Sequence, residues 1–144
     1  MGYRIVVADD SSVARSAIVA QLERDGHTVV AQAADGAEAV RLVTAFSPDI
    51  CALDLSMPVL DGIGAACEIR RMRPDIRLIL ITAYELEDHV LSAFRSGFDA
   101  FVTKKEVVED LPRAVREVMR GGRFASGKPL RVLLDGIVGG PGVH

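Results

Sequence analysis

Residues 50–54 read Ile-Cys-Ala-Leu-Asp, four apolar residues followed at once by a carboxylate. An uninterrupted apolar run of this length is typical of a strand that is covered on both faces. Similar runs recur along the chain and predict four more strands, at residues 5–8, 28–31, 78–81 and 100–103. The sequence therefore predicts five short, buried strands.

The stretches between these strands carry apolar residues at three- and four-residue steps, which predicts amphipathic helices. Ser11 or Ser12 can cap the first of them, and Gly26 ends it. We expect the other helices at residues 35–46, 63–72, 87–96 and 107–120. Strict alternation of buried strands and helices indicates an α/β fold, a doubly wound and mostly parallel sheet with helices on both faces.

The chain has 144 residues, of which 49% are hydrophobic and 26% are charged, a balance that indicates one globular domain and excludes wholesale disorder. The formal net charge of −3 disfavours nucleic-acid binding as the main role of this segment. No apolar run is long enough to span a membrane and the N-terminus lacks a signal-peptide pattern, so we expect a cytoplasmic protein without a membrane partner. Cys51 and Cys67 lie in apolar stretches, and we expect both to be buried and reduced.

The composition changes after residue 122, where the last helical pattern gives way to a short amphipathic piece and a glycine-rich end. We expect residues 1–122 to form the main domain and residues 123–144 to form a C-terminal extension or linker. Its pattern is typical of a short helix at residues 129–134 followed by a flexible tail.

Polar side chains follow four of the five predicted strands. In chain order they are Asp9 and Asp10 after the first strand, Asp54 after the third, Thr82 after the fourth and Lys104 after the fifth. Ligands of open parallel sheets bind at the carboxyl ends of the strands, near the point where the strand order reverses. If the first and third strands are central, these side chains meet at one edge of the sheet.

Three carboxylates in one pocket repel one another and call for a cation. Their hard oxygen atoms in a partly hydrated site indicate Mg²⁺, which takes one or two protein carboxylates together with waters and phosphate oxygens. A lysine adds a point charge suited to a phosphoryl oxygen, and a threonine hydroxyl adds a neutral donor. This set of groups points to phosphoryl transfer onto a carboxylate.

Four stretches of the chain carry these residues in a fixed order. They are Val7-Ala8-Asp9-Asp10-Ser11, Leu53-Asp54-Leu55-Ser56-Met57-Pro58-Val59-Leu60-Asp61-Gly62, Ile81-Thr82-Ala83 and Phe101-Val102-Thr103-Lys104. As an ordered set they resemble the receiver domain of two-component response regulators, over residues 3–121. The resemblance implies a flavodoxin-like, five-stranded parallel sheet with strand order 2-1-3-4-5.

The resemblance also implies a phosphorylation switch that depends on Mg²⁺. Asp54 would be the phosphoacceptor and would share the ion with Asp10, which binds it directly. Asp9 would help through a water molecule, and the backbone carbonyl of Ser56 would complete the protein ligands. Lys104 would pair with the acyl phosphate.

Two further residues would carry the switch itself. Thr82 would bond a phosphoryl oxygen and draw its loop inward, and Phe101 would rotate toward the space that Thr82 vacates. The surface formed by the helix at 87–96, the strand at 100–103 and the last helix would change as a result. Ser56 and Tyr84 flank the pocket in the family pattern, and we expect them to tune the lifetime of the phosphate.

Two features depart from the common receiver pattern or extend it. Many receivers carry proline after the lysine, whereas this chain has Lys105, so we expect a trans peptide bond at Lys104–Lys105. The stretch Arg120-Gly121-Gly122-Arg123-Phe124-Ala125-Ser126 resembles receivers of the NarL/FixJ subfamily. Such receivers usually continue into a helix-turn-helix domain that binds DNA, which this chain is too short to contain.

The resemblance implies a sensor histidine kinase as phosphoryl donor, and it makes a homodimer on phosphorylation plausible. We expect a signalling switch rather than an enzyme, with only slow self-phosphorylation and autodephosphorylation. The alternative is a stand-alone or phosphorylation-independent receiver that acts as a protein-interaction module. An aspartyl-phosphate phosphatase is disfavoured because it needs a second aspartate two residues after the nucleophile, where this chain has Ser56.

Overall fold

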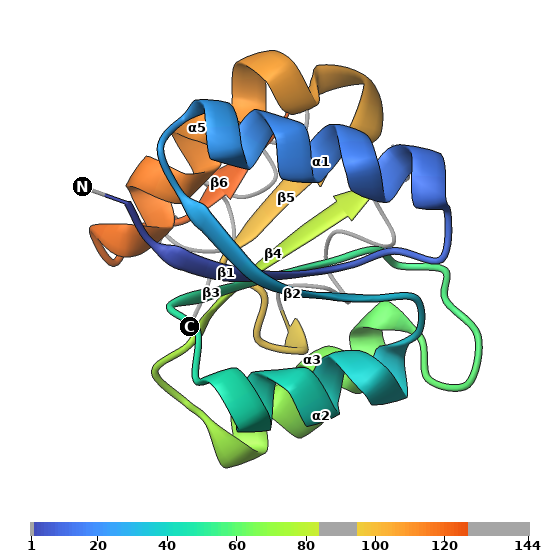
Figure 1. Ribbon diagram of the computed structural model, residues 1–144. Coiled ribbons are helices and arrows are strands. Elements are labelled where there is room, and N and C mark those ends of the chain that lie inside the picture. Colours follow the sequence, from blue (N-terminus) through green and yellow to red (C-terminus); the bar gives the residue numbers. More distant parts are fainter. Residues whose placement is uncertain (1, 84–94, 127–144) are drawn as a thin grey trace.

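The structure, a computed structural model, describes residues 2–83 and 95–126. These residues form a six-stranded sheet in the order β2-β1-β3-β4-β5-β6, in which all neighbouring strands run parallel. Helices α1 and α5 cover one face and helices α2 and α3 cover the other (Figure 1). The doubly wound parallel fold expected from the sequence is therefore confirmed.

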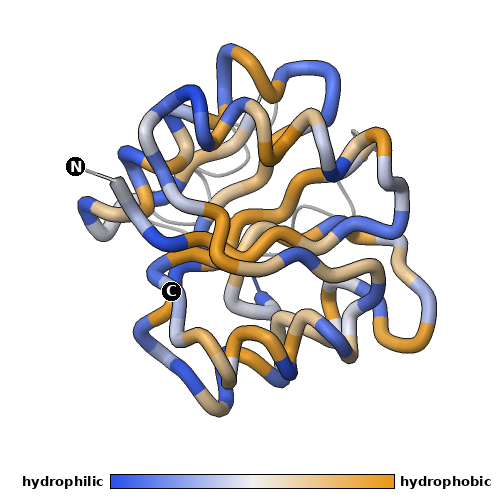
Figure 2. The backbone as a smooth tube through the Cα atoms, in the orientation of Figure 1, coloured by the Kyte–Doolittle hydropathy of each residue, from blue (hydrophilic) through white to orange (hydrophobic). Residues whose placement is uncertain are grey.

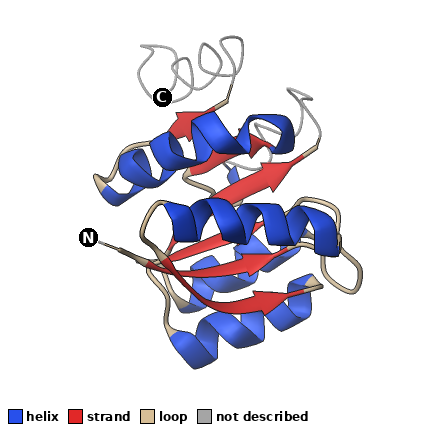
Figure 3. Ribbon diagram, turned by 45° about the horizontal axis from the view of Figure 1, so that its top comes forward, coloured by secondary structure: helices blue, strands red, loops and turns tan. Residues whose placement is uncertain are grey.

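The elements follow one another in strict alternation through most of the chain. The strands are β1 (Arg4–Ala8), β2 (Thr28–Ala33), β3 (Ile50–Leu53), β4 (Arg77–Thr82), β5 (Ala100–Thr103) and β6 (Phe124–Ala125). The helices are α1 (Ser12–Arg24), α2 (Gly36–Phe46), α3 (Gly62–Met72) and α5 (Val107–Met119), and a 3-10 turn, η1 (Lys104–Glu106), precedes α5. Figure 3 shows the strands between the two helical layers.

All five predicted strands are present in the predicted order, and a sixth was not predicted. β6 has only two residues, too few to show any periodicity, and it lies just beyond the boundary at residue 122 that the sequence suggested. The predicted helix at 87–96, apart from its last two residues, and the predicted helix at 129–134 lie outside the described residues. No peptide bond among the described residues is cis, so Lys104–Lys105 is trans as expected.

Alternate residues of each strand face opposite helical layers, so the core has two halves. Val6 and Ala8 of β1 pack toward α2 and α3, whereas Ile5 and Val7 pack toward α1 and α5. Because both faces are covered, β1, β3, β4 and β5 carry apolar residues at consecutive positions in their centres rather than at every second position. Figure 2 shows this as a hydrophobic centre of the fold with hydrophilic residues along its outside.

Helices α1, α2 and α3 each begin with a side-chain cap. Ser11, Asp35 and Asp61 accept hydrogen bonds from the backbone N–H groups three residues later, at 3.2, 2.7 and 2.8 Å. Such caps satisfy N–H groups that have no partner inside the helix. Asp61 therefore caps the first turn of α3.

Two features of the structure differ from expectation or were missed. Cys51 is buried as expected, but Cys67 is exposed, because it lies on the outer side of α3. Arg70 of α3 was not singled out in the sequence. It donates hydrogen bonds of 2.6–2.7 Å to the carbonyl groups of Pro74, Ile76 and Gly97, and it pairs with Asp99 at 3.0 Å. None of the helices described is long and apolar enough to cross a bilayer.

Candidate functional site

The ends of β1, β3, β4 and β5 lie side by side at the carboxyl edge of the sheet. Ala8 is in register with Leu53, and Thr82 with Thr103. Leu53 is also in register with Leu80, so β4 and β5 extend two residues beyond β1 and β3 at the same edge. The strand order thus brings together the polar side chains that the sequence analysis selected.

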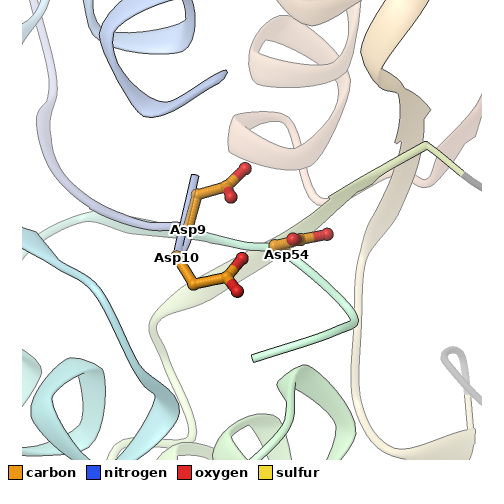
Figure 4. A group of neighbouring side chains, drawn as sticks. All are labelled: Asp9, Asp10 and Asp54. Atoms are coloured by element: carbon orange, nitrogen blue, oxygen red, sulfur yellow. The ribbon is translucent and has the colours of Figure 1, made fainter. Parts of the chain in front are cut away.

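Three carboxylates form a cluster at this edge, which we call the carboxylate cluster: Asp9, Asp10 and Asp54. One oxygen of each lies within 4.8 Å of the others. Figure 4 shows the three side chains close together where the chain leaves β1 and β3. Asp9 is fully buried and Asp54 is 5% exposed, whereas Asp10 is open to solvent. A bound cation could therefore keep contact with water through the Asp10 side.

Lys104 spans two members of the carboxylate cluster. Its Nζ lies 2.8 Å from Asp9 Oδ2 and 3.3 Å from Asp54 Oδ2. No hydrogen-bond donor among the described residues is aligned on the buried Asp9 Oδ2, so the ion pair with Lys104 is what compensates its charge. The other Asp9 oxygen, Oδ1, accepts the backbone N–H of Ser11 at 2.9 Å. Both carboxylate oxygens of Asp9 therefore contact other residues of the protein, whereas the exposed Asp10 is available to a ligand.

The charges of the site do not balance. Three carboxylates face one ammonium group, which leaves an excess of negative charge in a largely buried place. Burial, and after it the charge of Asp9, raise the pKa of Asp54 to about 6, although Lys104 opposes this change. Burial lowers the pKa of Lys104, but its close ion pairs with Asp9 and Asp54 outweigh burial and raise the pKa. Lys104 therefore stays charged, and a divalent cation would restore neutrality.

The raised pKa of Asp54 predicts how the stability depends on pH in the presence of EDTA. Asp54 binds its proton more tightly in the folded chain than in the unfolded chain, where the pKa is about 3.9. The stabilisation is therefore fully present below about pH 4 and is lost as the pH rises through about 6. We expect Asp54→Asn to stabilise the protein at pH 7.5 by on the order of 1–2 kcal/mol, after allowance for solvent screening.

Urea unfolding of both proteins between pH 4 and 8 measures this difference. The stabilising effect of Asp54→Asn should shrink as the pH falls toward 4, where the native carboxyl group is also neutral. If the difference in unfolding free energy between the two proteins does not change with pH, burial does not raise the pKa of Asp54.

The loop between β3 and α3 passes very close to the phosphoacceptor candidate. A Cβ atom on Gly62 would collide with the backbone carbonyl of Asp54, and the Gly62 N–H donates to the Leu55 carbonyl at 2.9 Å. Ser56 is exposed on this loop, two residues after Asp54. The absence of a side chain at position 62 thus allows α3 to begin directly against the site.

Gly62→Ala is expected to destabilise the protein by about 1–3 kcal/mol, because the collision is with backbone that cannot rotate away. Gly64→Ala is the matched control, since its Cβ would meet side-chain atoms of Leu60 and Asp61 rather than backbone, and alanine favours the helix. Urea unfolding midpoints of the two variants measure the contrast. Equal midpoints would contradict the tight approach of α3 to the Asp54 loop.

Three further residues were predicted to act at the site, namely Thr82, Phe101 and Tyr84. Thr82 ends β4 at the same edge and is fully buried. Phe101 is also fully buried, in the core half that packs against α2 and α3. Tyr84 lies outside the described residues. The structure therefore places Thr82 near the carboxylate cluster and holds Phe101 inward.

Sequence reasoning missed one residue at the rim of the site. Arg15 of α1 donates from Nη1 to the backbone carbonyl of Asp9 at 2.6 Å and from Nε to Gln32 Oε1 at 3.3 Å. It ties the first turn of α1 to the ends of β1 and β2. Nothing in the sequence distinguishes this arginine from the others on exposed helix faces.

The fold and the site define a doubly wound α/β protein with a cluster of carboxylates and a lysine at the carboxyl edge of its sheet. Comparison with known proteins then shows the family: residues 5–116 match the response regulator receiver domain. The chain belongs to this family, and it is a receiver domain of a two-component response regulator of the NarL/LuxR type.

Relatives include both longer regulators and a shorter protein that the match covers almost completely. The oxygen regulatory protein NreC of Staphylococcus carnosus is 34% identical over 141 residues, which cover 96% of this chain and 65% of NreC. The chemotaxis protein CheY of Bacillus subtilis is 32% identical over 119 residues, 83% of this chain and 99% of CheY. The chain thus spans somewhat less than two thirds of the first relative.

Solved structures agree with this assignment. A two-component response regulator of the LuxR family from Aurantimonas superposes with a TM-score of 0.85 and 32% identity, covering 92% of this chain and 94% of that one. The response regulator domain of CheB from Thermotoga maritima gives a TM-score of 0.77 and 28% identity over 83% of this chain and 98% of its own. These comparisons confirm both the family and the receiver fold.

Proposed function

We propose that this receiver takes a phosphoryl group from a sensor histidine kinase onto Asp54, with Mg²⁺ as cofactor. The observation that carries the proposal is the carboxylate cluster with its lysine: three carboxylates within 4.8 Å, and Lys104 Nζ 3.3 Å from Asp54. Positively charged partners placed before the reaction stabilise charge that develops on a transferred phosphoryl group. The family assignment supports the same chemistry.

The groups of the carboxylate cluster fit Mg²⁺ by their chemistry. They are hard oxygen donors with excess negative charge, and the exposed Asp10 leaves room for bound water. Asp10, Asp54 and the backbone carbonyl of Ser56 would hold the ion directly, and Asp9 would hold it through water. When bound, the ion supplies positive charge that offsets the repulsion between Asp54 and an incoming phosphoryl group.

The reaction exchanges one bond to phosphorus for another. An Asp54 carboxylate oxygen attacks the phosphorus of the phosphohistidine, and the P–N bond breaks as the new P–O bond forms. The imidazole leaves with the bonding electron pair and takes up a proton from solvent. Lys104, already within reach of Asp54, pairs with the phosphoryl oxygens of the product. The chain is a switch rather than an enzyme, with only slow self-phosphorylation and loss of the phosphate.

The switch itself is assigned to Thr82 and Phe101. The Thr82 hydroxyl bonds a phosphoryl oxygen and draws its loop toward Asp54, and Phe101 follows into the space released. The buried position of both residues supports this role, because a change in one packed core residue must be matched by its neighbours. The surface around β5 and α5 then differs between the two states. The exposed position of Ser56 supports a role in limiting the access of water to the phosphate, a role that Tyr84 shares.

We propose that the output of the switch lies in a separate domain. Relatives that extend beyond the matched region include the transcriptional regulatory protein YhcZ of Bacillus subtilis, of which the match covers 56%. We infer that phosphorylation acts in the cytoplasm and controls DNA binding through a separate C-terminal helix-turn-helix domain. A homodimer formed on phosphorylation would couple the two events.

Phosphorylation by acetyl phosphate tests the assignment of Asp54. The chain is incubated with acetyl phosphate and Mg²⁺, and the intact mass is measured. We expect the wild-type chain to gain one phosphoryl group and Asp54→Asn to gain none. Labelling of Asp54→Asn to the wild-type extent would overturn the assignment. If neither protein is labelled by acetyl phosphate or by histidine kinases, the phosphorylation-independent interaction module is the better description.

A further inference from the structure

Ser126 is a buried polar residue directly after β6, outside the set of residues assigned above. It is fully buried, and its backbone N–H donates to the Phe101 carbonyl at 2.8 Å. Its hydroxyl oxygen accepts the backbone N–H of Thr103 at 3.2 Å. Both partners lie on β5, which leads directly into Lys104. Ser126 thus contacts the strand that presents the lysine of the site.

The hydroxyl group of Ser126 replaces a missing backbone acceptor. β6 pairs with β5 in the register Ala100–Phe124 and Phe101–Ala125 and ends there. In a parallel ladder, the N–H of Thr103 would next be met by the carbonyl of residue 126. The side-chain oxygen of the same residue meets it instead. A side chain without an acceptor at position 126 would leave a buried N–H unsatisfied, which is costly.

The backbone at Thr103 sets the direction in which Lys104 leaves the sheet. The Thr103 hydroxyl donates to Glu106 Oε1 at 2.7 Å, which closes the turn η1 that begins at Lys104. Ser126 therefore holds the N–H of Thr103 and Glu106 holds its hydroxyl. These two hydrogen bonds hold Thr103 in place. Lys104 follows it directly and reaches Asp9 and Asp54 from that position.

A specific turn brings Ser126 to this position. After α5, Gly121 adopts a positive φ of 86°, and the Gly122 N–H donates to the Glu117 carbonyl at 2.8 Å. The chain then reverses, and the Phe124 N–H donates to the Asp99 carbonyl at 3.2 Å. The segment following α5 is therefore part of the sheet next to β5.

We propose that Ser126 is a positioning residue for Lys104, and that β6 thereby belongs to the phosphorylation machinery of this chain. The proposal rests on the proposed function, in which Lys104 pairs with the phosphoryl group. Ser126 does not touch the reacting atoms. It acts through the backbone of Thr103, and removing its hydroxyl group lets the start of η1 relax and the lysine lose alignment.

The test measures the rate of phosphorylation of the full chain by acetyl phosphate at saturating Mg²⁺. Loss of one hydrogen bond corresponds to a rate loss of about two- to tenfold, which we expect for Ser126→Ala. Cysteine is close to serine in size but is a weaker acceptor, so the phosphorylation rate of Ser126→Cys should lie between those of the wild type and Ser126→Ala. The dissociation constant for Mg²⁺, measured by calorimetry, should not change, because the proposed ligands come from β1, β3 and the loop after β3.

Two controls separate positioning from general destabilisation. Val43→Ala removes buried methyl groups from α2, which packs on β1, β2 and β3, and it should lower the melting temperature without slowing phosphorylation. In the background of Lys104→Met, Ser126→Ala should cause no further loss of rate, because the lysine that it positions is gone.

Three results would overturn the proposal. They are a wild-type rate in Ser126→Ala, an independent further loss in the Lys104→Met background, and equal slowing by Val43→Ala at matched stability. Failure of the proposed function gives a different pattern: the wild-type chain is not labelled, or Asp54→Asn is labelled as well, and the role of Ser126 falls with it.

Discussion

Lys104→Met is expected to destabilise the protein by about 2–4 kcal/mol in the presence of EDTA, a value that allows for the partial exposure of the lysine. The reason is the carboxylate that the lysine leaves behind. Asp9 Oδ2 is buried and depends on Lys104 for charge compensation. Breaking a buried ion pair from one side is much more costly than replacing both partners. Urea unfolding at pH 7.5 measures the loss.

The same variant should lose phosphorylation by a factor of about 100 or more, since it removes the cation nearest to Asp54 from the reacting site. Lys105→Met is the matched control, because it removes the same charge from an exposed neighbouring position. Saturating Mg²⁺ should restore part of the stability of Lys104→Met by supplying positive charge to the carboxylate cluster. If the two lysine variants behaved alike, Lys104 would have neither the structural nor the chemical role given to it.

Asp10→Asn is expected to weaken Mg²⁺ binding by about tenfold to a hundredfold and to slow phosphorylation in parallel. Asp10 is the exposed member of the carboxylate cluster, so its charge is the one most available to an ion. The folded state should not suffer, because the change also removes repulsion from Asp9 and Asp54. Stability equal to or above that of the wild type is therefore part of the prediction.

Calorimetric titration with Mg²⁺, together with rates measured across a range of Mg²⁺ concentrations, tests this expectation. Asp75→Asn is the control: it removes an exposed carboxylate just before β4, at the opposite end of the sheet. Its Mg²⁺ affinity should match the wild type. Unchanged Mg²⁺ affinity in Asp10→Asn would place the ion elsewhere.

The fold could be predicted from the sequence because its strands are covered on both faces. Such strands appear as unbroken apolar runs, and the structure finds strands at each of the five positions. The site followed from the same reasoning, since polar residues directly after parallel strands must meet at one edge. Asp9, Asp10, Asp54 and Lys104 meet there, and Thr82 ends the neighbouring strand.

The features that were missed depend on contacts between distant parts of the chain. β6 is held by its register with β5 rather than by any pattern of its own two residues. The interactions of Arg70 with Gly97 and Asp99 join segments almost thirty residues apart. The burial of Asp9 against Lys104 was also missed, because adjacent aspartates look alike in the sequence and only the family resemblance gave them different roles.

A crystal structure of the chain with Mg²⁺ and beryllofluoride, a phosphoryl analogue, would test the central claim most directly. We predict beryllofluoride bound to the carboxylate of Asp54, with the ion in contact with Asp10, Asp54 and the Ser56 carbonyl and with Lys104 on a fluorine atom. An ion bound away from the ends of β1 and β3, or beryllofluoride attached to another residue, would contradict the account.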